Sequence, residues 1–295
     1  MANARALDKR RKSIRNIRKI TRTMELIATA RYKKAMERAQ AATAYTEQIT
    51  KIVSRLAAAG LDVKHPLLDP RAETNSARVL VLTSNRGLCG GYNAAVLREA
   101  VPRIRELKEN VPDVAIDVSG KRGIDGLRFR KFSVDERHTN FEDQPKYDEV
   151  EKIANSYLAR YITGEIDRLD VIYTKFISTS KQIPQVETLL PLGSLGGEEL
   201  VDDHAKDANI DFEFLPSAES ILEEVVPTSF KVRLFKCFLD AAVSEQVARM
   251  VAMKGATENA GEMIKQLSMT YNRARQSQIT GEIMEIIGGV EALEK

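Results

Sequence analysis

The sequence contains no tryptophan, and aromatic residues make up only 6% of it. This scarcity argues against a large aromatic core and against the base-stacking platforms that bind single-stranded nucleic acid. Its two cysteines, Cys89 and Cys237, lie far apart and follow no metal-binding spacing. We therefore expect neither a disulfide framework nor a zinc site, and a reducing, cytoplasmic setting is the default.

Long apolar runs are also missing. No stretch of 18 or more apolar residues occurs, so the sequence predicts no membrane span. The N-terminus is basic, but no apolar signal core follows it, which argues against a secretory signal. The formal net charge of +3 is too small to argue for nucleic-acid binding by itself.

Glycine and proline are absent from residues 2–59. Alternating steps of three and four residues from Ile14 to Leu56 pass through thirteen positions, of which ten are apolar. This pattern is typical of a coiled-coil seam. It predicts one helix roughly 85 Å long, at about 1.5 Å per residue, that ends near Gly60.

A second seam lies at the other end of the chain, from about Thr228 to Ile287. The same stepping from Val232 to Ala274 again finds ten apolar residues among thirteen positions. Pro227, the last proline, is expected at the start of this helix. Three glycines within the helix weaken it by up to about 1 kcal/mol each: Gly255, Gly261 and Gly281.

Neither long helix can bury its apolar stripe alone, so we expect the two to pack on each other. A compact middle segment joins them, which makes the pair antiparallel, with both termini at one tip and the middle segment at the other end. The seams carry alanines that allow close helix approach. Polar residues interrupt them, and these either fix the register or reach a surrounding partner: Arg31, Arg38, Gln246 and Arg249.

The middle segment has the pattern of an α/β domain. Strands are expected at Arg78–Thr83, Val114–Ser119, Leu169–Phe176 and Gln185–Leu190, with a weaker candidate at Asp211–Leu215. Helices are expected at Tyr92–Glu109 and Lys146–Ile166. This alternation predicts a mainly parallel sheet. The expected division of the chain is residues 1–60 for the first helix, 77–215 for the central α/β domain and 217–295 for the last helix.

The turn Asn85–Gly91 follows the first strand and precedes a helix, where a phosphate-binding loop would lie. It lacks the Lys-Ser/Thr pair of a Walker A motif and the spacing of a dinucleotide fingerprint. We favour a tight turn whose glycines supply positive φ.

Cys89 has no partner base in the sequence, and the histidines are expected at the surface: His65, His138 and His204. We expect no catalytic residue, no metal and no cofactor.

The basic N-terminus is a stronger signal. Residues 1–22 carry nine Lys or Arg and one acid, Asp8. Charge patterning favours an acidic partner and a passive solvated face about equally. Near the C-terminus, apolar residues crowd a helix end that has little hairpin left to cover it, which indicates a partner: Ile283, Met284, Ile286, Ile287, Val290 and Leu293.

Several separated motifs resemble those of the gamma subunit of F-type ATP synthase. Together they span nearly the whole chain: Arg18–Glu25, Asn85–Asn93, Ser244–Lys254, Tyr271–Gln276, Ile279–Ile283 and Glu285–Gly289. The chain departs from the family pattern at three positions, with Asn85 where Asp is usual, Val290 where Ala is usual, and Gly281 in place of a longer polar residue.

The resemblance implies an antiparallel coiled-coil hairpin with a central Rossmann-like α/β domain. This hairpin would be the rotating central stalk of a bacterial, proton-translocating ATP synthase. It would fill the cavity of a hexamer of catalytic and non-catalytic nucleotide-binding subunits, one copy per complex. The central domain would rest, with a small epsilon-type subunit, on a ring of membrane proteolipids, as a peripheral protein at the cytoplasmic face of the inner membrane.

The resemblance also implies partner-binding residues. Arg18, Lys19, Arg22 and Met24 would meet the acidic lever of a catalytic subunit. Four residues of the last helix would form a hydrogen-bonding catch with a catalytic subunit: Arg249, Gln276, Thr280 and Glu282. Phe212 and Phe214 fall where the family contacts the proteolipid ring. Two alternatives remain open: a basic coiled-coil binder of nucleic acid or a membrane surface, and an α/β nucleotide-binding enzyme that uses Asn85–Gly91.

Overall fold

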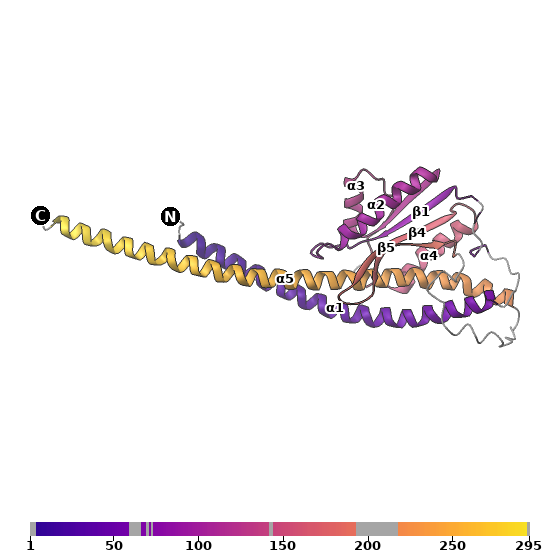
Figure 1. Ribbon diagram of the computed structural model, residues 1–295, viewed down its shortest axis with the longest axis horizontal. Coiled ribbons are helices and arrows are strands. Elements are labelled where there is room, and N and C mark those ends of the chain that lie inside the picture. Colours follow the sequence, from indigo (N-terminus) through magenta and orange to yellow (C-terminus); the bar gives the residue numbers. More distant parts are fainter. Residues whose placement is uncertain are drawn as a thin grey trace. The chain divides into compact units, whose positions relative to one another are not determined.

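The computed structural model describes residues 4–58, 66–68, 71, 73–141, 144–192 and 218–293. Two very long helices bound the chain, α1 (Ala4–Ala58) and α5 (Ala218–Leu293) (Figure 1). Between them lie the elements of an α/β domain: β1 (Ser76–Leu82), α2 (Tyr92–Asn110), β2 (Asp113–Ser119), α3 (Lys121–Phe129), β3 (Glu136–His138), α4 (Tyr147–Ile162), β4 (Arg168–Phe176) and β5 (Gln182–Leu190). The predicted fold class is confirmed. Phe212 and Phe214 and the weak strand candidate Asp211–Leu215 lie outside the described residues.

The chain forms two compact units. The first, here called the terminal unit, combines residues 1–29 with residues 249–295. The second, here called the sheet unit, spans residues 30–248. Each of the two long helices contributes to both units, because α1 and α5 are both continuous across the division.

The sheet has the strand order β3-β2-β1-β4-β5. β1 pairs in parallel with β2 and β4, β2 pairs in parallel with β3, and β5 is antiparallel to β4. This confirms the mainly parallel sheet, and each strong strand candidate overlaps an observed strand. The order 3-2-1-4 matches the first four positions of the Rossmann-type order 3-2-1-4-5-6.

Sequence reasoning missed α3 and β3. Gly123 and Gly126 weaken the helical pattern of residues 121–129, yet both glycines lie where neighbouring side chains approach closely. A Cβ at Gly123 would lie 2.5 Å from Oγ1 of Thr83, and a Cβ at Gly126 would lie 2.4 Å from Cδ1 of Leu97. Strand β3 has only three residues, Glu136–His138, and no apolar alternation by which it could be recognised.

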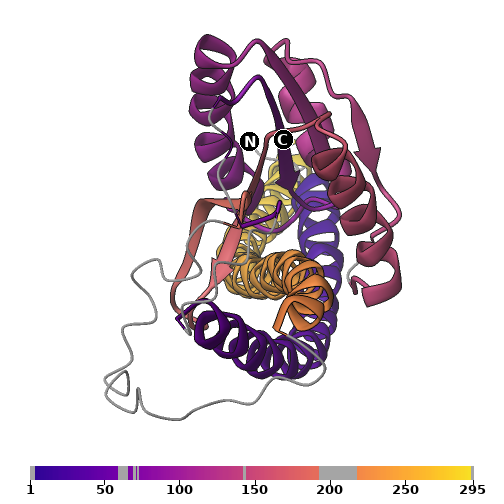
Figure 2. The same ribbon diagram turned by 90° about the vertical axis from the view of Figure 1, so that its right-hand side faces the viewer.

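Helices cover both faces of the sheet. Residues Val79 and Val81 of β1 pack in one cluster with α2 and α3, while Leu80 and Leu82 pack in another with α4 and α5. Successive residues of a strand point to opposite faces, so β1 supplies both cores. Figure 2 shows the sheet unit with α5 lying against this second face.

Within the sheet unit, α5 is enclosed from several sides. Phe230 and Leu234 face the sheet cluster, whereas Leu239 and Val243 pack in a third cluster with Ala35 and Ala39 of α1. The two helices run in opposite directions (Figure 1), as expected for an antiparallel pair. The alanines let the two backbones approach closely, as the seam pattern predicted.

Pro227 does not begin the last helix, although the seam pattern led us to expect the helix start there. Helix α5 begins at Ala218, and Pro227 lies inside it rather than at its first turn. An internal proline removes one helical hydrogen bond and costs about 3 kcal/mol. Val226 and Phe230, on either side, are both fully buried. Burial of two such side chains contributes about 1.5–3 kcal/mol each, which offsets the defect.

Helix α4 ends at Ile162 rather than at the expected Ile166. Gly164 adopts a left-handed φ of 82° and turns the chain. Ile166 then enters the core, with 1% of its surface exposed.

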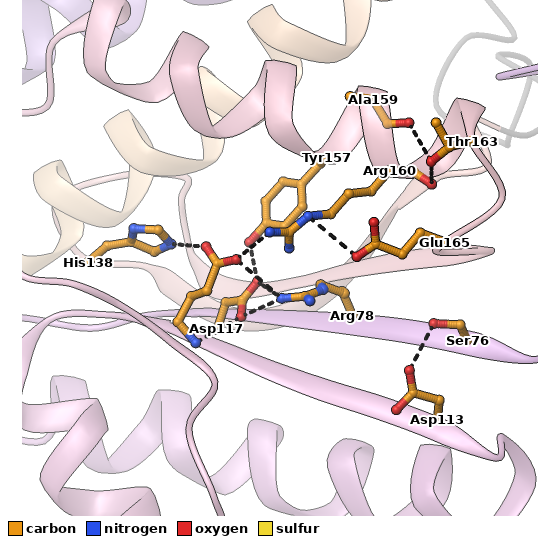
Figure 3. A network of polar contacts seen from close by, with 11 residues as sticks. Ser76, Arg78, Asp113, Asp117, His138, Tyr157, Ala159, Arg160, Thr163 and Glu165 are labelled. Atoms are coloured by element: carbon orange, nitrogen blue, oxygen red, sulfur yellow. Dashed lines mark hydrogen bonds and ion pairs between the residues drawn. The ribbon is translucent and has the colours of Figure 1, made fainter.

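A buried carboxylate pins the sheet to α4. Asp117 on β2 is fully buried and accepts hydrogen bonds from Nη1 of Arg78 at 3.0 Å and from the hydroxyl of Tyr157 at 2.7 Å (Figure 3). Burial, and then the Asp117 carboxylate, raises the pKa of Tyr157, so the phenol stays protonated and donates. Glu136 extends the network to Nη2 of Arg160 at 2.7 Å.

His138 belongs to the same network, although the sequence placed it at the surface. Its ring is half-buried on β3, with Nε2 3.9 Å from Glu136. Burial lowers the pKa of His138, against the opposing attraction of Asp117 and Glu136. A second buried carboxylate, Asp170, lies in β4, where Nε of Arg103 and Nε of Arg168 each approach it at 2.8 Å.

Asp240 is a different case, because burial is the largest influence on its pKa. Only 5% of its surface is exposed. Burial raises the pKa of Asp240 from 3.8 to about 6, while Lys236 and Lys175 lower it and Glu187 raises it further. Ionising this group in the folded chain therefore costs free energy that the unfolded chain does not incur.

We predict that Tyr157→Phe lowers the free energy of unfolding by about 1.5–3 kcal/mol, because Asp117 then loses a hydrogen bond inside the core. Urea unfolding of the full chain measures the change. Tyr271→Phe is the matched control, since that ring is half-buried and keeps its place under Arg11. Equal stability of the two variants would contradict the assignment.

We predict that Asp240→Asn stabilises the chain near neutral pH but not at pH 4. The folded pKa is raised, so the favourable contribution of Asp240 is complete below 3.8 and is lost as pH rises through about 6. The free energy of unfolding of the variant should rise relative to that of the wild type across this pH range, by about 1–3 kcal/mol at pH 7. Denaturant unfolding across pH tests this, and a constant difference between the two proteins would refute it.

Candidate partner-binding surface

The terminal unit is a helix pair. Oγ1 of Thr257 donates to Oγ1 of Thr21 at 2.8 Å, and the guanidinium of Arg11 lies 4.6 Å from the ring centroid of Tyr271. Moving from Thr21 to Arg11 lowers the residue number on α1, while the partner on α5 moves up from Thr257 to Tyr271. The two helices are therefore antiparallel in this unit too. Ala28, Met253 and Ala260 are buried in this seam.

Apolar side chains that the helix pair does not bury cover much of its surface. On α1, Ile17, Ile20, Leu26 and Ile27 are each about half exposed. Ile17 was predicted to lie in the seam, but 45% of its surface is exposed. On α5, the exposed set is larger: Val251, Met263, Met269, Ile279, Ile283, Met284, Ile286, Ile287 and Val290.

The end of α5 has no cover from α1. Residues 276–290 are all exposed, and Arg11, in the second turn of α1, already lies beside Tyr271. This confirms the expectation that the C-terminal apolar residues lie on a helix end that the hairpin leaves bare. Exposed apolar surface of this extent indicates a protein partner.

Basic residues occupy the α1 side of the same unit. Arg18 and Lys19 are exposed, and Nη1 of Arg22 is 2.7 Å from Oε1 of Glu25. Asp8, the one acid of the first 22 residues, is ion-paired to Arg11 at 2.6 Å and to Lys12 at 3.0 Å. Hydrogen bonds from Lys12 and Arg11 lower the pKa of Asp8. Most of the basic charge is left facing outward.

The structure brings most of the predicted partner-binding residues into the terminal unit, but not into one cluster. Met24 is half-buried beside the exposed Arg18 and Lys19. Gln276, Thr280 and Glu282 lie together on the bare end of α5, where Nε2 of Gln278 donates to Oε1 of Glu282 at 2.9 Å.

Arg249 is separate from that group. Only 6% of its surface is exposed, and it precedes Gln276 by about 40 Å of helix at about 1.5 Å per residue. The other polar residues predicted in the two seams also differ from one another in burial. Gln246 is fully buried in the sheet unit, whereas Arg38 is exposed and Arg31 half-exposed.

The Asn85–Gly91 turn makes its polar contacts internally. Oδ1 of Asn85 accepts from the backbone N–H of Lys121 at 3.1 Å, and Oγ1 of Thr83 accepts from that of Gly123 at 2.9 Å. These bonds tie the turn and the end of β1 to α3. The helix that follows the turn is α2, and its first N–H, that of Tyr92, donates to the carbonyl of Cys89 at 3.2 Å rather than facing an anion site. Gly90 has a φ of 56°, in agreement with the tight-turn interpretation.

Helix α5 occupies the place where a nucleotide would bind such a sheet. Ligands of doubly wound sheets lie beyond the carboxyl ends of the strands at the switch point, here between β1 and β4. There the hydroxyl of Tyr92 donates to the carbonyl of Ala241 at 3.2 Å, and Oγ of Ser244 donates to that of Thr174 at 3.1 Å. Both cysteines are buried. These contacts argue against the nucleotide-binding enzyme.

The polar networks around Asp117 and Asp170 stabilise the fold and do not form a binding or catalytic site. Sequence reasoning missed both networks. The available signal was an aspartate in the middle of an apolar strand, in Ala115-Ile116-Asp117-Val118 and in Leu169-Asp170-Val171. Every carboxylate in these networks is met by an arginine of the same domain. No group of three or more candidate metal ligands occurs in the described part of the chain.

Comparison with known proteins decides the family. A family model described as ATP synthase matches residues 3–293. An ATP synthase gamma chain from Rhodopirellula baltica is 78% identical over 295 residues, covering all of both chains. One from Leptospira biflexa is 37% identical over 301 residues, covering 99% of this chain and all of that one. The chain belongs to the ATP synthase gamma chain family.

Chains in solved structures of mitochondrial ATP synthases share the fold. A chain from the Euglena gracilis mitochondrial ATP synthase (OSCP/F1/c-ring) matches with a TM-score of 0.65 at 20% identity, over 98% of this chain and 94% of that one. A central-stalk chain of the Tetrahymena thermophila enzyme matches with a TM-score of 0.57 at 19% identity, over 80% and 99%.

Membership of the gamma family identifies the chain as a stalk subunit of a rotary ATP synthase, and not one of its catalytic chains. The resemblance stated from the sequence motifs is thereby confirmed. In the described part of the chain, no helix is both long and apolar enough to cross a bilayer.

The bare end of α5 also explains a departure from the family pattern. A Cβ at Gly281, Gly288 or Gly289 would meet nothing within 4 Å. We predict that Gly281→Ala slows amide hydrogen exchange over residues 278–290, because alanine favours a helix by about 0.5–1 kcal/mol over glycine. Gly126→Ala is the contrasting control and should destabilise the sheet unit. Unchanged or faster exchange in the first variant would refute the prediction.

Proposed function

We propose that the terminal unit is the part of this stalk that contacts the catalytic hexamer, and that it transmits rotation to the catalytic sites by unequal contact. The observation that carries the proposal is the placement of exposed apolar residues. Most of the large ones in the described chain lie in this unit, on both α1 and α5. Such a surface fits an enclosing apolar sleeve.

The unit is chemically different on its different sides, which supports the coupling mechanism. Residues of α1 present outward-facing cations such as Arg18 and Lys19, whereas the end of α5 presents isoleucines and methionines. Three identical catalytic sites around such a rod would each meet a different side. A rod can shift a site's affinity only through differential contact with that site's states, and rotation moves those contacts from site to site.

Specific contacts follow from the positions of the side chains. Arg18, Lys19, Arg22 and Met24 would contact an acidic segment of a catalytic subunit. Gln276, Thr280 and Glu282, all exposed on the bare end of α5, would form a hydrogen-bonding catch near the tip. Arg249 is buried, so its role in such a catch would require a partner to reach the seam or the side chain to move outward.

Torque reaches this unit through α5. That helix is one uninterrupted element from Ala218 to Leu293, and its first third is packed into the sheet unit. Rotation driven at the sheet unit would therefore be carried by a continuous helix with its antiparallel partner. We propose proton flow through a membrane proteolipid ring as the drive, with Phe212 and Phe214 near the ring and an epsilon-type subunit beside the sheet unit.

This arrangement places the chain, in one copy per complex, at the cytoplasmic face of the inner membrane as a peripheral subunit. It needs no cofactor and no nucleic acid. Affinity purification of a tagged chain from the native host tests the assembly. We expect both nucleotide-binding subunits, an epsilon-type subunit and the proteolipid in stoichiometric yield. Recovery of the tagged chain with nucleic acid and without these subunits would contradict it.

We predict that the double variant Arg18→Glu, Lys19→Glu weakens coupling between ATP hydrolysis and proton pumping several-fold while the complex still assembles, because both side chains are exposed. Lys33→Glu, Lys34→Glu is the matched control, with two exposed lysines of α1 in the sheet unit. ATP-driven proton pumping in inverted vesicles, compared with hydrolysis rate, measures coupling. Coupling as tight as in the control would refute the acidic contact.

A further inference from the structure

A basic tip ends helix α3, at the far side of the sheet from α5. It consists of Arg128, Phe129, Arg130 and Lys131, all exposed. Phe129 is exposed over 87% of its surface, more than any other large apolar side chain in the described chain. A phenyl ring held in water with cations on both sides has no role in the packing of the domain.

The charges of this basic tip are not neutralised locally. Among the described residues, no ion pair reaches Arg128, Arg130 or Lys131. Nη1 of Arg130 donates only to the carbonyl of Gly126, at 2.8 Å. Asp125, one turn earlier, is the nearest acid in the sequence, and it forms no ion pair with them. The tip therefore presents three positive charges around one ring.

The backbone at the end of α3 is strained, because a lysine occupies a left-handed position in the helix cap. The N–H of Phe132 bonds the carbonyl of Leu127 at 3.0 Å and the N–H of Lys131 bonds that of Arg128 at 2.9 Å, which is the pattern of a Schellman cap. Its left-handed position is occupied by Lys131, with a φ of 64°. Glycine is strongly preferred there, because a side chain strains that conformation.

Attraction to the negative end of the helix dipole accounts for cations near the end of α3. It does not account for Phe129, nor for a lysine where glycine would relieve strain. Backbone strain that the fold does not require is a reason to look for a ligand. The ligand must be anionic and must also accept an apolar ring.

We propose that the basic tip binds the surface of an anionic lipid bilayer. A phenyl ring at the boundary of headgroups and acyl chains, flanked by Lys and Arg, is the chemistry of interfacial anchoring. Each cation near such a surface strengthens binding by about fivefold, and salt removes the effect. A protein partner would need about 800 Å² of shaped surface, whereas this tip is a single projecting helix end that a fluid bilayer can fit.

The absence of tryptophan from the chain allows a direct test. Phe129→Trp places the sole indole at the tip, at a position too exposed to affect folding. With vesicles of phosphatidylcholine and phosphatidylglycerol, we expect a blue shift of emission and quenching by brominated acyl chains. Both effects should vanish in high salt and with phosphatidylcholine alone.

The control variant is Ile162→Trp, at the end of α4 and 60% exposed. The basic N-terminus can also bind these vesicles, so sedimentation alone would not distinguish the two surfaces. The control indole should not shift while the one at 129 does. No shift at 129, or equal shifts at both positions, would overturn the proposal, as would a shift at 129 with an acidic polypeptide but not with lipid.

Lys131→Gly separates binding from folding. It should raise Tm, because the strained position is relieved, yet weaken the vesicle affinity reported by an indole at 129 by about fivefold. Arg105→Gln, which removes an exposed charge of α2, should change that affinity less. A higher Tm with unchanged affinity would show that the basic tip does not contact lipid. This inference does not depend on the role proposed for the terminal unit.

Discussion

The antiparallel contact between α1 and α5 is the constraint on which the rest of the structure depends. Each helix is several times longer than the ~11–12 residues of an average globular helix. Neither can bury its stripe without the other. Alanines at the contact, Ala28, Ala35, Ala39 and Ala260, are buried almost completely, so the two backbones lie close. The same pairing recurs in both compact units.

Helix α5 meets different surroundings along its length. In the sheet unit it is part of the core, with Phe230, Leu234 and Val243 fully buried. In the terminal unit the same helix has one buried stripe and an exposed remainder, and every residue from Arg275 to Val290 is exposed. A single element thus joins a region that must hold its shape to a region that must present its surface. This is the physical requirement for a part that transmits rotation.

The sequence predicted what depends on periodicity. Both seams, the long β4 and β5 and the parallel sheet follow from apolar spacing alone. Features set by tertiary contact were missed. Pro227 lies inside a helix because its neighbours are buried on the sheet, and α3 contains glycines because Thr83 and Leu97 approach it closely. Helix propensity gives the free-energy cost of proline and glycine in a helix, but it does not reveal the tertiary packing that offsets this cost.

The residues of the candidate site also fall into those that the sequence predicted and those that it did not. Exposed apolar residues at the end of α5 were recognised from the sequence, because the seam ends before they do. Arg249 was assigned from family resemblance to the same catch as Gln276, yet its burial and its distance along α5 separate them. Asp117 and His138 form a network across β1, β2, β3 and α4, which no local pattern reveals.

A cross-link between the paired helices tests the central claim most directly. Thr21 and Thr257 lie side by side, with their hydroxyl oxygens 2.8 Å apart, and both native cysteines are buried. The account predicts that Thr21→Cys, Thr257→Cys forms an internal disulfide on mild oxidation, and that the assembled enzyme with this bond still couples hydrolysis to pumping, since both helices turn together. Ile20→Cys, Thr257→Cys, with Ile20 exposed, should not cross-link. Failure of the first pair to cross-link, or efficient cross-linking of both, would contradict the pairing; loss of coupling on cross-linking would contradict rotation of the two helices as one body.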